Sequence, residues 1–251
     1  MIKLENYEVM GWEAAIRGMR NPMNSWEKSD SGWLASGPSD EDIPVDIDRG
    51  GYYELIVGPN DQDLMKRLRN AGTDHRKFMR MITVYADITA PLYWWKEFDT
   101  YKVGTVANSC STMHKIATKE FTLEDFSHEY LDDEFECVKN PCADPYEGDF
   151  KTSIGILLDT IEALNWWRKQ YIHQKEIGAG QDRLKWCWWQ MIQLLPSSYN
   201  QKRTVMLNYE VLANIYKSRK NHKLDEWRDL CKWVESLPYS ELITGEPDKK
   251  E

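Results

Sequence analysis

Two asparagines and an arginine stand out in the C-terminal third of the sequence because of their spacing. Asn208, Asn214 and Arg219 lie in a stretch, 204–220, that contains no Gly or Pro and repeats apolar residues at helical intervals. This pattern predicts a helix. On that helix Asn208 and Arg219 share one largely apolar stripe, and Asn214 lies on its flank.

Polar groups on an apolar stripe need partners. Carboxamides and a guanidinium are costly to bury unless something, such as a bound ligand, accepts their hydrogen bonds. The alternative is a helix whose polar groups simply reach the rim of the core. Both interpretations are open on this pattern alone.

The same residues carry a resemblance to a known family. Leu195-Pro196 precedes Asn208 by twelve positions, counted from the proline, Asn214 follows six further on and Arg219 five beyond that. The spacing resembles, without a gap, the C-terminal motif of flavin-dependent thymidylate synthases. In that family the asparagines contact the flavin, and the arginine contacts the pyrimidine of dUMP and favours its N3-deprotonated form. The resemblance thus implies Asn208 and Asn214 as cofactor-binding residues and Arg219 as the catalytic residue, because a permanent cation stabilises an anionic ring.

A second segment resembles the family signature Arg-His-Arg-x-x-Ser-x-Asn-x-x-Ser-x-Arg less closely. Asn108 and Ser111 keep their places, once one inserted residue is allowed upstream. Tyr-Lys-Val at 101–103 replaces the Arg-His-Arg, Ser109 replaces a glutamate, and Met113 replaces the final arginine, which grips the substrate phosphate in the family. Lysine is a point charge and does not reproduce a bidentate fork, so the resemblance implies the fold more strongly than the activity.

Further site residues follow from this resemblance. At the cofactor, the residues expected besides the two asparagines are Tyr101, Lys102, Asn108 and Lys96. At the substrate, the residues expected are Ser109, Ser111, Lys202 and Arg203. Lys202 and Arg203, near the start of the predicted helix that bears Arg219, are the candidates to replace the cation lost at Met113. We expect Asn208 and Arg219 to line one pocket with Asn108 and Ser111.

Three functions are open. The first is an enzyme similar to flavin-dependent thymidylate synthases, which would methylate dUMP to dTMP with FAD, methylenetetrahydrofolate and NADPH. The resemblance also implies a homotetramer whose sites combine residues of different subunits. The second function is nucleotide binding without this catalysis, which the missing Arg-His-Arg favours. The third is a sister reaction, such as hydroxymethylation of a pyrimidine nucleotide.

The resemblance implies an α+β fold, with a central mostly antiparallel sheet flanked by long helices, over residues 1–244. A charged tail, 245–251, is expected to be disordered. Sequence patterns predict helices over 10–20, 61–70, 93–100, 153–174, 181–195, 204–220 and 224–237, and strands over 52–57 and 80–89. The turn-rich stretch 21–48 and the acidic stretch 124–149 are predicted to be loops.

Charge and hydropathy limit the partners. A formal net charge of −9 argues against non-specific binding of nucleic acids or anionic membranes, although a small anionic ligand needs only a local basic pocket. No stretch approaches the 18 apolar residues of a membrane span, and the N-terminus lacks the apolar core of a signal peptide. We therefore expect a soluble, cytoplasmic protein.

Cysteines and histidines give weak signals for metal or nucleophilic chemistry. Cys137 and Cys142 have only His128 near them in the sequence, which favours reduced thiols over a zinc site, and no metal is expected. Cys110 and His114 lie one helical turn apart. They are either a Cys–His nucleophile or, as the pattern favours, a buried thiol beside an unrelated histidine.

Twelve tryptophans are the strongest compositional feature. Adjacent pairs at 94–95, 166–167 and 188–189 lie in predicted helices. Neighbours on a helix point to different sides, so one tryptophan of each pair needs a second burial partner. This favours an oligomer.

Overall fold

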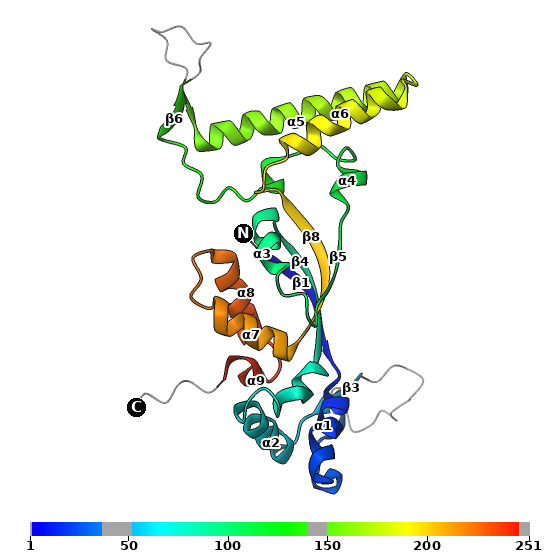
Figure 1. Ribbon diagram of the computed structural model, residues 1–251, viewed down its shortest axis with the longest axis vertical. Helices are drawn as coiled ribbons and strands as arrows, with labels where there is room; N and C mark the ends of the chain where they lie inside the picture. Colours follow the sequence, from blue (N-terminus) through cyan, green and yellow to red (C-terminus); the bar gives the residue numbers. More distant parts are fainter. Residues whose placement is uncertain (1, 37–51, 140–149, 246–251) are drawn as a thin grey trace, which may run out of the picture. The chain divides into compact units, whose positions relative to one another are not determined.

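A computed structural model describes residues 2–36, 52–139 and 150–245. Its central sheet has the strand order β1-β4-β8-β5 (Figure 1). The strands are β1 (Lys3–Met10), β4 (Thr83–Pro91), β8 (Asn200–Asn208) and β5 (Val106–Ser109). With helices accompanying an antiparallel sheet, the predicted α+β class is confirmed.

Backbone hydrogen bonds at the ends of β4 and β8 fix their relative direction. Leu92 N donates to the carbonyl of Tyr199 at 3.0 Å, and Tyr209 N donates to the carbonyl of Ile82, also at 3.0 Å. The partner number rises on one strand as it falls on the other, which is the antiparallel arrangement. Burial along β4 alternates as its sequence predicts, with residues 84, 86 and 88 buried.

The chain forms two compact units, each built from segments that are distant in the sequence. We call the first the hairpin unit; it comprises Met1–Lys3, Ile88–Thr100 and Asn108–Thr204. The second, the α7 unit, comprises Leu4–Asp87, Tyr101–Ala107 and Val205–Glu251. All four strands of the central sheet, β1, β4, β5 and β8, have residues in both units. The single domain expected over 1–244 stays a prediction, and the expected tail lies outside the described residues after Gly245.

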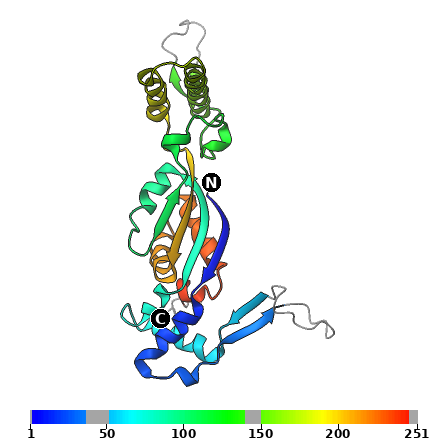
Figure 2. The same ribbon diagram turned by 90° about the vertical axis from the view of Figure 1, so that its right-hand side faces the viewer.

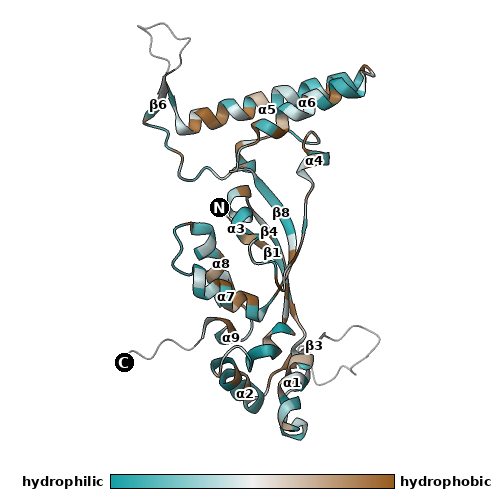
Figure 3. Ribbon diagram, in the orientation of Figure 1, coloured by the Kyte–Doolittle hydropathy of each residue, from teal (hydrophilic) through white to brown (hydrophobic). Residues whose placement is uncertain are grey.

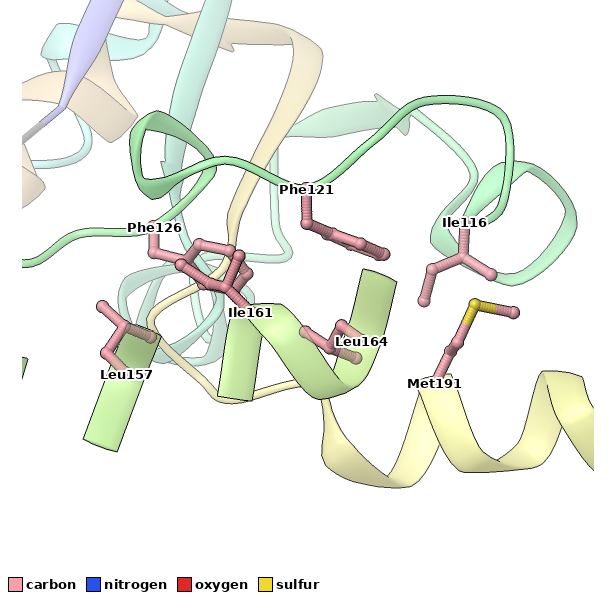
Figure 4. Packing of buried hydrophobic residues seen from close by; sticks show 7 residues of the cluster. All are labelled: Ile116, Phe121, Phe126, Leu157, Ile161, Leu164 and Met191. Atoms are coloured by element: carbon pink, nitrogen blue, oxygen red, sulfur yellow. The ribbon is translucent and has the colours of Figure 1, made fainter. Parts of the chain in front are cut away.

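The hairpin unit is built around two long helices, α5 (Ser153–Glu176) and α6 (Gln181–Leu194), which lie side by side (Figures 1 and 2). Their apolar residues pack against the chain between residues 116 and 126 (Figure 4). The cluster consists of Ile116, Phe121, Phe126, Leu157, Ile161, Leu164 and Met191. The unit also contains α3 (Leu92–Phe98), α4 (Thr112–Lys115), η5 (Leu123–Asp125) and the antiparallel pair β6 (Glu136–Lys139) and β7 (Phe150–Thr152).

The α7 unit carries the remaining elements. They are α1 (Trp12–Arg20), η1 (Asn21–Met23), η2 (Trp26–Lys28), α2 (Pro59–Asn70), η4 (Arg76–Arg80), α7 (Tyr209–Arg219), α8 (Asp225–Glu235) and α9 (Glu241–Thr244). The antiparallel strand pair β2 (Gly32–Ser36) and β3 (Tyr52–Ile56) also belongs to the α7 unit (Figure 2).

A buried ion pair joins α1 to α2 in this unit. Arg20 Nε lies 2.6 Å from Asp61 Oδ1, and both side chains are almost fully buried. Burial alone would raise the pKa of Asp61, but hydrogen bonds from Ser29, Ser31 and Arg20 lower that pKa below its ordinary value. The carboxylate therefore stays charged and fixes the loop before β2.

The helix predicted over 204–220 is wrong in its first part. Strand β8 runs to Asn208, and α7 begins only at Tyr209. Val205 and Leu207 are buried on alternate positions, so this short apolar run fits a strand as well as a helix, and pairing with β4 decides for the strand. Asn208 therefore precedes the helix and does not lie on its stripe.

The predicted loops also contain regular structure. Within 21–48, the described part holds η1, η2 and β2, and within 124–149 it holds η5 and β6. Pairing with partner strands β3 and β7 organises segments that local composition favours as loops. The rest of both stretches, 37–48 and 140–149, lies outside the described residues.

The tryptophan pairs do not behave alike. Trp94 and Trp95 are both fully buried, so this pair finds its burial partners within the chain and gives no support to the expected oligomer. On α5 and α6, by contrast, Trp166 and Trp189 are 52% and 41% exposed. Figure 3 shows that α5 mixes hydrophobic and hydrophilic residues along its length. In the described ranges, no helix is both long and apolar enough to span a bilayer.

Candidate functional site

Arg219 is the last residue of α7, and two aromatic residues hold its side chain. Its Nε donates to the hydroxyl oxygen of Tyr101 at 2.9 Å. The guanidinium carbon lies 4.7 Å from the ring centre of Trp227 and 5.7 Å from that of Tyr101. Trp227 is fully buried on α8, which packs against α7 (Figure 1). Cation–π contact and the phenol together orient the fork of Arg219.

The segment 101–104 reaches the other end of α7 through a glycine. The carbonyl of Gly104 accepts a long hydrogen bond, 3.4 Å, from Asn208 Nδ2. Gly104 has a φ of +80°, and a Cβ there would lie 2.7 Å from Asn208 Nδ2 and 3.1 Å from Val211. The positive φ favours glycine, and any Cβ would displace the Asn208 side chain. The segment 101–104, which begins with the counterpart of the Arg-His-Arg signature, thus contacts both ends of α7: Gly104 contacts Asn208 before the helix, and Tyr101 contacts Arg219 at its end.

Asn208 acts as the N-cap of α7. Its Oδ1 accepts from the backbone N–H of Val211 at 3.0 Å, while its Nδ2 is turned to Gly104. The side chain is therefore engaged at both polar atoms, and the residue is only 8% exposed. This explains the asparagine by helix capping, and its contact with a flavin stays a prediction.

Asn214 lies on an exposed side of α7, beside a group of charged residues. Its Oδ1 accepts from Arg76 Nη2 at 3.3 Å. Arg76 also contacts the buried carboxylate of Glu210, which forms a second ion pair with Arg80. Asn214 and Arg76 line a cavity of about 490 Å³. This size falls within the range of small-molecule sites.

The residues expected at the substrate lie in the hairpin unit, on two neighbouring segments. Ser111 caps α4 by accepting from His114 N at 3.0 Å. Cys110 N donates to the carbonyl of Lys202 at 2.9 Å, and Gln201 Nε2 donates to the carbonyl of Cys110 at 3.0 Å. The exposed residues of the Asn108–Ser111 segment therefore lie beside Lys202 and its neighbours, although about ninety positions separate them in the sequence.

Lys202 and Arg203 were predicted to lie near the start of the helix that bears Arg219. This prediction is wrong, because both residues lie on β8. Arg203 donates from Nη1 to Asp99 Oδ1 at 2.8 Å and from Nε to Gln201 Oε1 at 2.9 Å. Its guanidinium carbon also lies 4.2 Å from the ring centre of Trp95. Asp99 therefore balances much of the charge that was expected to replace the arginine lost at Met113.

The other predicted cations and polar groups lie at the surface. Lys96 on α3, Lys102 before β5, and Asn108 and Ser109 on β5 are all exposed. Asn208 and Arg219 belong to the α7 unit, while Asn108 and Ser111 belong to the hairpin unit. The pocket expected to combine all four stays a prediction.

Two residues escaped the sequence analysis. Trp227 contacts Arg219 only through the packing of α8 on α7, and no local signal marks it among twelve tryptophans. Gly104 carries a recognisable signal, since a glycine between predicted elements often marks a positive φ.

The cysteines described by the structure are free. Cys110 is exposed, which corrects the expectation of a buried thiol at this position. Cys137 contacts the carbonyl of Lys151, and Cys142 lies outside the described residues. Within the described ranges, no three His, Cys, Asp or Glu residues gather as metal ligands would.

Comparison with known proteins bears on the fold. No family model matches the sequence, and no curated protein matches it. Among solved structures, thymidylate synthase X (ThyX) from Helicobacter pylori, crystallised with FAD and dUMP, has 17% sequence identity and a TM-score of 0.54. The match covers 98% of this chain and 96% of that one.

Two further structures agree. A second H. pylori ThyX complex with FAD and dUMP has 18% identity and a TM-score of 0.53, over 98% of this chain and 97% of that one. The UMP/dUMP methylase PolB from Streptomyces cacaoi, bound with 5-Br dUMP, has 12% identity and a TM-score of 0.51, over 97% and 95%. At these identities the likeness concerns the fold alone: the chain has the fold of flavin-dependent thymidylate synthases.

Proposed function

We propose that the protein methylates a pyrimidine nucleotide, dUMP, in a flavin-dependent reaction with methylenetetrahydrofolate as carbon donor and NADPH as reductant. The observation that carries the proposal is the Arg219 site. A guanidinium held by Tyr101 and Trp227 stands where the family motif requires a permanent cation. The fold shared with ThyX and PolB, both described with pyrimidine nucleotides, supports the same substrate class.

Arg219 would stabilise the N3-deprotonated uracil ring. A guanidinium remains protonated at any physiological pH, so it acts by charge and hydrogen bonding and not as a base. Tyr101 is a positioning residue in this proposal, because its hydroxyl accepts from Nε and thereby orients the two terminal nitrogens. Such preorganisation strengthens interactions that develop as the ring becomes anionic.

The flavin has a better fit at Asn214 than at Asn208. Asn208 caps α7 and contacts Gly104, whereas Asn214 opens onto the cavity that also contains Arg76. The carboxamide and the cations there suit the polar and phosphate groups of FAD. Bound FAD would supply the hydride. Tyr101 and Lys102 remain proposed flavin contacts, with Asn108 and Lys96.

A second candidate is nucleotide binding without methylation. It is favoured by the absence of cations where the signature has them: Val103 is 90% exposed and Met113 is 48% exposed, and both are apolar. The ion pair of Arg203 with Asp99 weakens the proposed compensation. Hydroxymethylation of the same nucleotide is a further variant, which differs in its product.

Two measurements on the same preparation separate these functions. Purified protein is reconstituted with FAD, and dUMP binding is measured by calorimetry for the unmutated protein, Arg219→Ala and Arg219→Lys. The unmutated protein is also incubated with dUMP, methylenetetrahydrofolate and NADPH, and the nucleotide product is identified. We expect dUMP binding that falls about ten- to a hundredfold in Arg219→Ala, since a charged hydrogen bond contributes about 1.5–3 kcal/mol. Arg219→Lys should fall less, because it keeps the charge but loses the fork. Arg17→Ala, at an exposed arginine of α1, is the control.

The outcomes are distinct. Formation of dTMP from dUMP, methylenetetrahydrofolate and NADPH would support the proposal, and a hydroxymethylated product would support the variant reaction. Binding of dUMP without turnover would favour the second candidate. If neither FAD nor dUMP binds the unmutated protein, both candidates fail. An affinity equal in Arg219→Ala and Arg17→Ala would assign Arg219 a structural role only.

A further inference from the structure

A strongly basic concave surface of the α7 unit is the cavity at Asn214. It is formed by the ends of α2 and α9, by η4 and by one side of α7, and its volume is about 490 Å³. Four cations line it: Arg69, Arg76, Lys217 and Lys220. Among the described residues of its lining, none is acidic. In a protein with a net charge of −9, such a concentration of one sign calls for a physical explanation.

The two arginines are fixed in place by the fold. Arg69 donates from Nε to the carbonyl of Leu242 at 3.2 Å and from Nη2 to that of Ile243 at 3.3 Å. Its guanidinium also packs on Gly245, where a Cβ would lie 2.5 Å from Nη2. Gly245 has a φ of +84°, so glycine is required there for two reasons. Arg69 is thus held at the wall of the cavity.

Arg76 is held by contacts with α7. It contacts Glu210 and donates to Asn214 Oδ1 at 3.3 Å. Glu210 is shared with Arg80, whose charge Asp74 also stabilises. Arg76 is therefore a fixed hydrogen-bond donor at the wall of the cavity.

Lys217 and Lys220 are the two flexible cations of the cavity lining, since lysine side chains at the surface can change conformation around a ligand. They lie one turn apart in the chain, at the end of α7, and both are exposed. Lys220 Nζ lies 5.8 Å from the ring centre of Tyr216, which also lines the cavity. Two like charges at this spacing repel each other, and an anion between them would remove that repulsion.

We propose that this cavity binds a phosphate-bearing anion with two or more charges, gripped by Lys217 and Lys220 against the fixed arginines. Phosphate oxygens accept charge-assisted hydrogen bonds from lysine and arginine alike, and the cavity has room for a di- or triphosphate group. The phosphates come either from the flavin cofactor proposed above or from a separate nucleotide. The anion site itself does not depend on the proposed methylation, because it rests on charge and geometry alone.

The test uses inorganic tripolyphosphate as the probe, in calorimetric titrations of the full chain at low ionic strength. We expect binding that weakens with added salt, as charge pairing requires. The double variant Lys217→Gln/Lys220→Gln should reduce the affinity about a hundredfold, at roughly tenfold for each charged hydrogen bond lost. Both residues are exposed, so the variant should fold.

The matched control is Lys77→Gln/Lys232→Gln. It removes the same charge from the same unit, at two exposed lysines outside the cavity lining. Equal losses in both double variants would overturn the proposal, because the effect would then be general screening. Absence of tripolyphosphate binding by the unmutated protein would overturn it as well.

A competition arm identifies the source of the phosphates. Tripolyphosphate displaced by saturating FAD would assign the cavity to the cofactor, and additive binding of both would assign it to a separate nucleotide. Either result keeps the anion site. Protein that binds tripolyphosphate but neither FAD nor dUMP would refute the proposed function and leave this inference standing.

Discussion

Gly104 offers the sharpest test of how the signature segment is held against α7. Replacing it by alanine places a Cβ 2.7 Å from Asn208 Nδ2 and 3.1 Å from Val211, at a φ of +80°. The left-handed backbone alone costs about 1–2 kcal/mol for a residue with a Cβ. Moving Asn208 also weakens the N-cap, which costs about 1 kcal/mol. We therefore expect Gly104→Ala to lower the free energy of unfolding by about 2–3 kcal/mol, the sum of the two terms.

Gly72→Ala is the matched control in the same unit. Gly72 has a φ of +109°, and a Cβ added there would meet nothing within 4 Å, so it isolates the backbone term. Its φ lies further from the left-handed helical region than that of Gly104, so the control carries at least as much backbone strain. Its expected loss is about 1–2 kcal/mol.

Urea denaturation measures the loss of stability in both variants. The comparison is valid if the dependence of the free energy of unfolding on urea concentration is the same in both variants and the parent. Hydrogen exchange at the Val211 amide gives a local readout, since that N–H donates to Asn208 Oδ1. We expect faster exchange in Gly104→Ala and no change in Gly72→Ala. Equal stability losses, with unchanged exchange at Val211, would refute the packing argument.

Two further predictions concern the ion pair and assembly. Asp61→Asn should cost about 3–5 kcal/mol at neutral pH because it leaves Arg20 buried and unpaired. The lowered pKa of Asp61 means that its contribution is present above the ordinary value of 3.8 and is lost as the pH falls through the folded pKa. The gap between variant and parent, measured by denaturation, should therefore narrow in acid; a constant gap would contradict this. The exposed Trp166 and Trp189 predict a homotetramer or at least a dimer, which Trp166→Glu/Trp189→Glu should dissociate. A monomer of the unmutated protein in light scattering at micromolar concentration would refute it.

Long periodic segments were predictable from the sequence because their local pattern and their packing agree. Helix α5 was predicted over 153–174 and observed at Ser153–Glu176, and β4 shows the predicted alternation of buried residues. The spacing of Pro196, Asn208, Asn214 and Arg219 predicted the fold that the solved structures share, although sequence identity to the first of them is only 17%.

The tertiary structure alone decided what surrounds those residues. Residues 205–208 fit strand and helix periods equally, and only pairing with β4 made them part of β8 and turned Asn208 into a cap. The sequence predicts Arg203 as a cation available to a ligand, but in the structure it donates a hydrogen bond to Asp99, which is distant in the sequence. Likewise, Trp227 and Tyr101 meet at Arg219 through the packing of separate segments. The local sequence determines the periodicity of helices and strands. The partners of a charged side chain depend on contacts between residues distant in the sequence, and no local pattern contains that information.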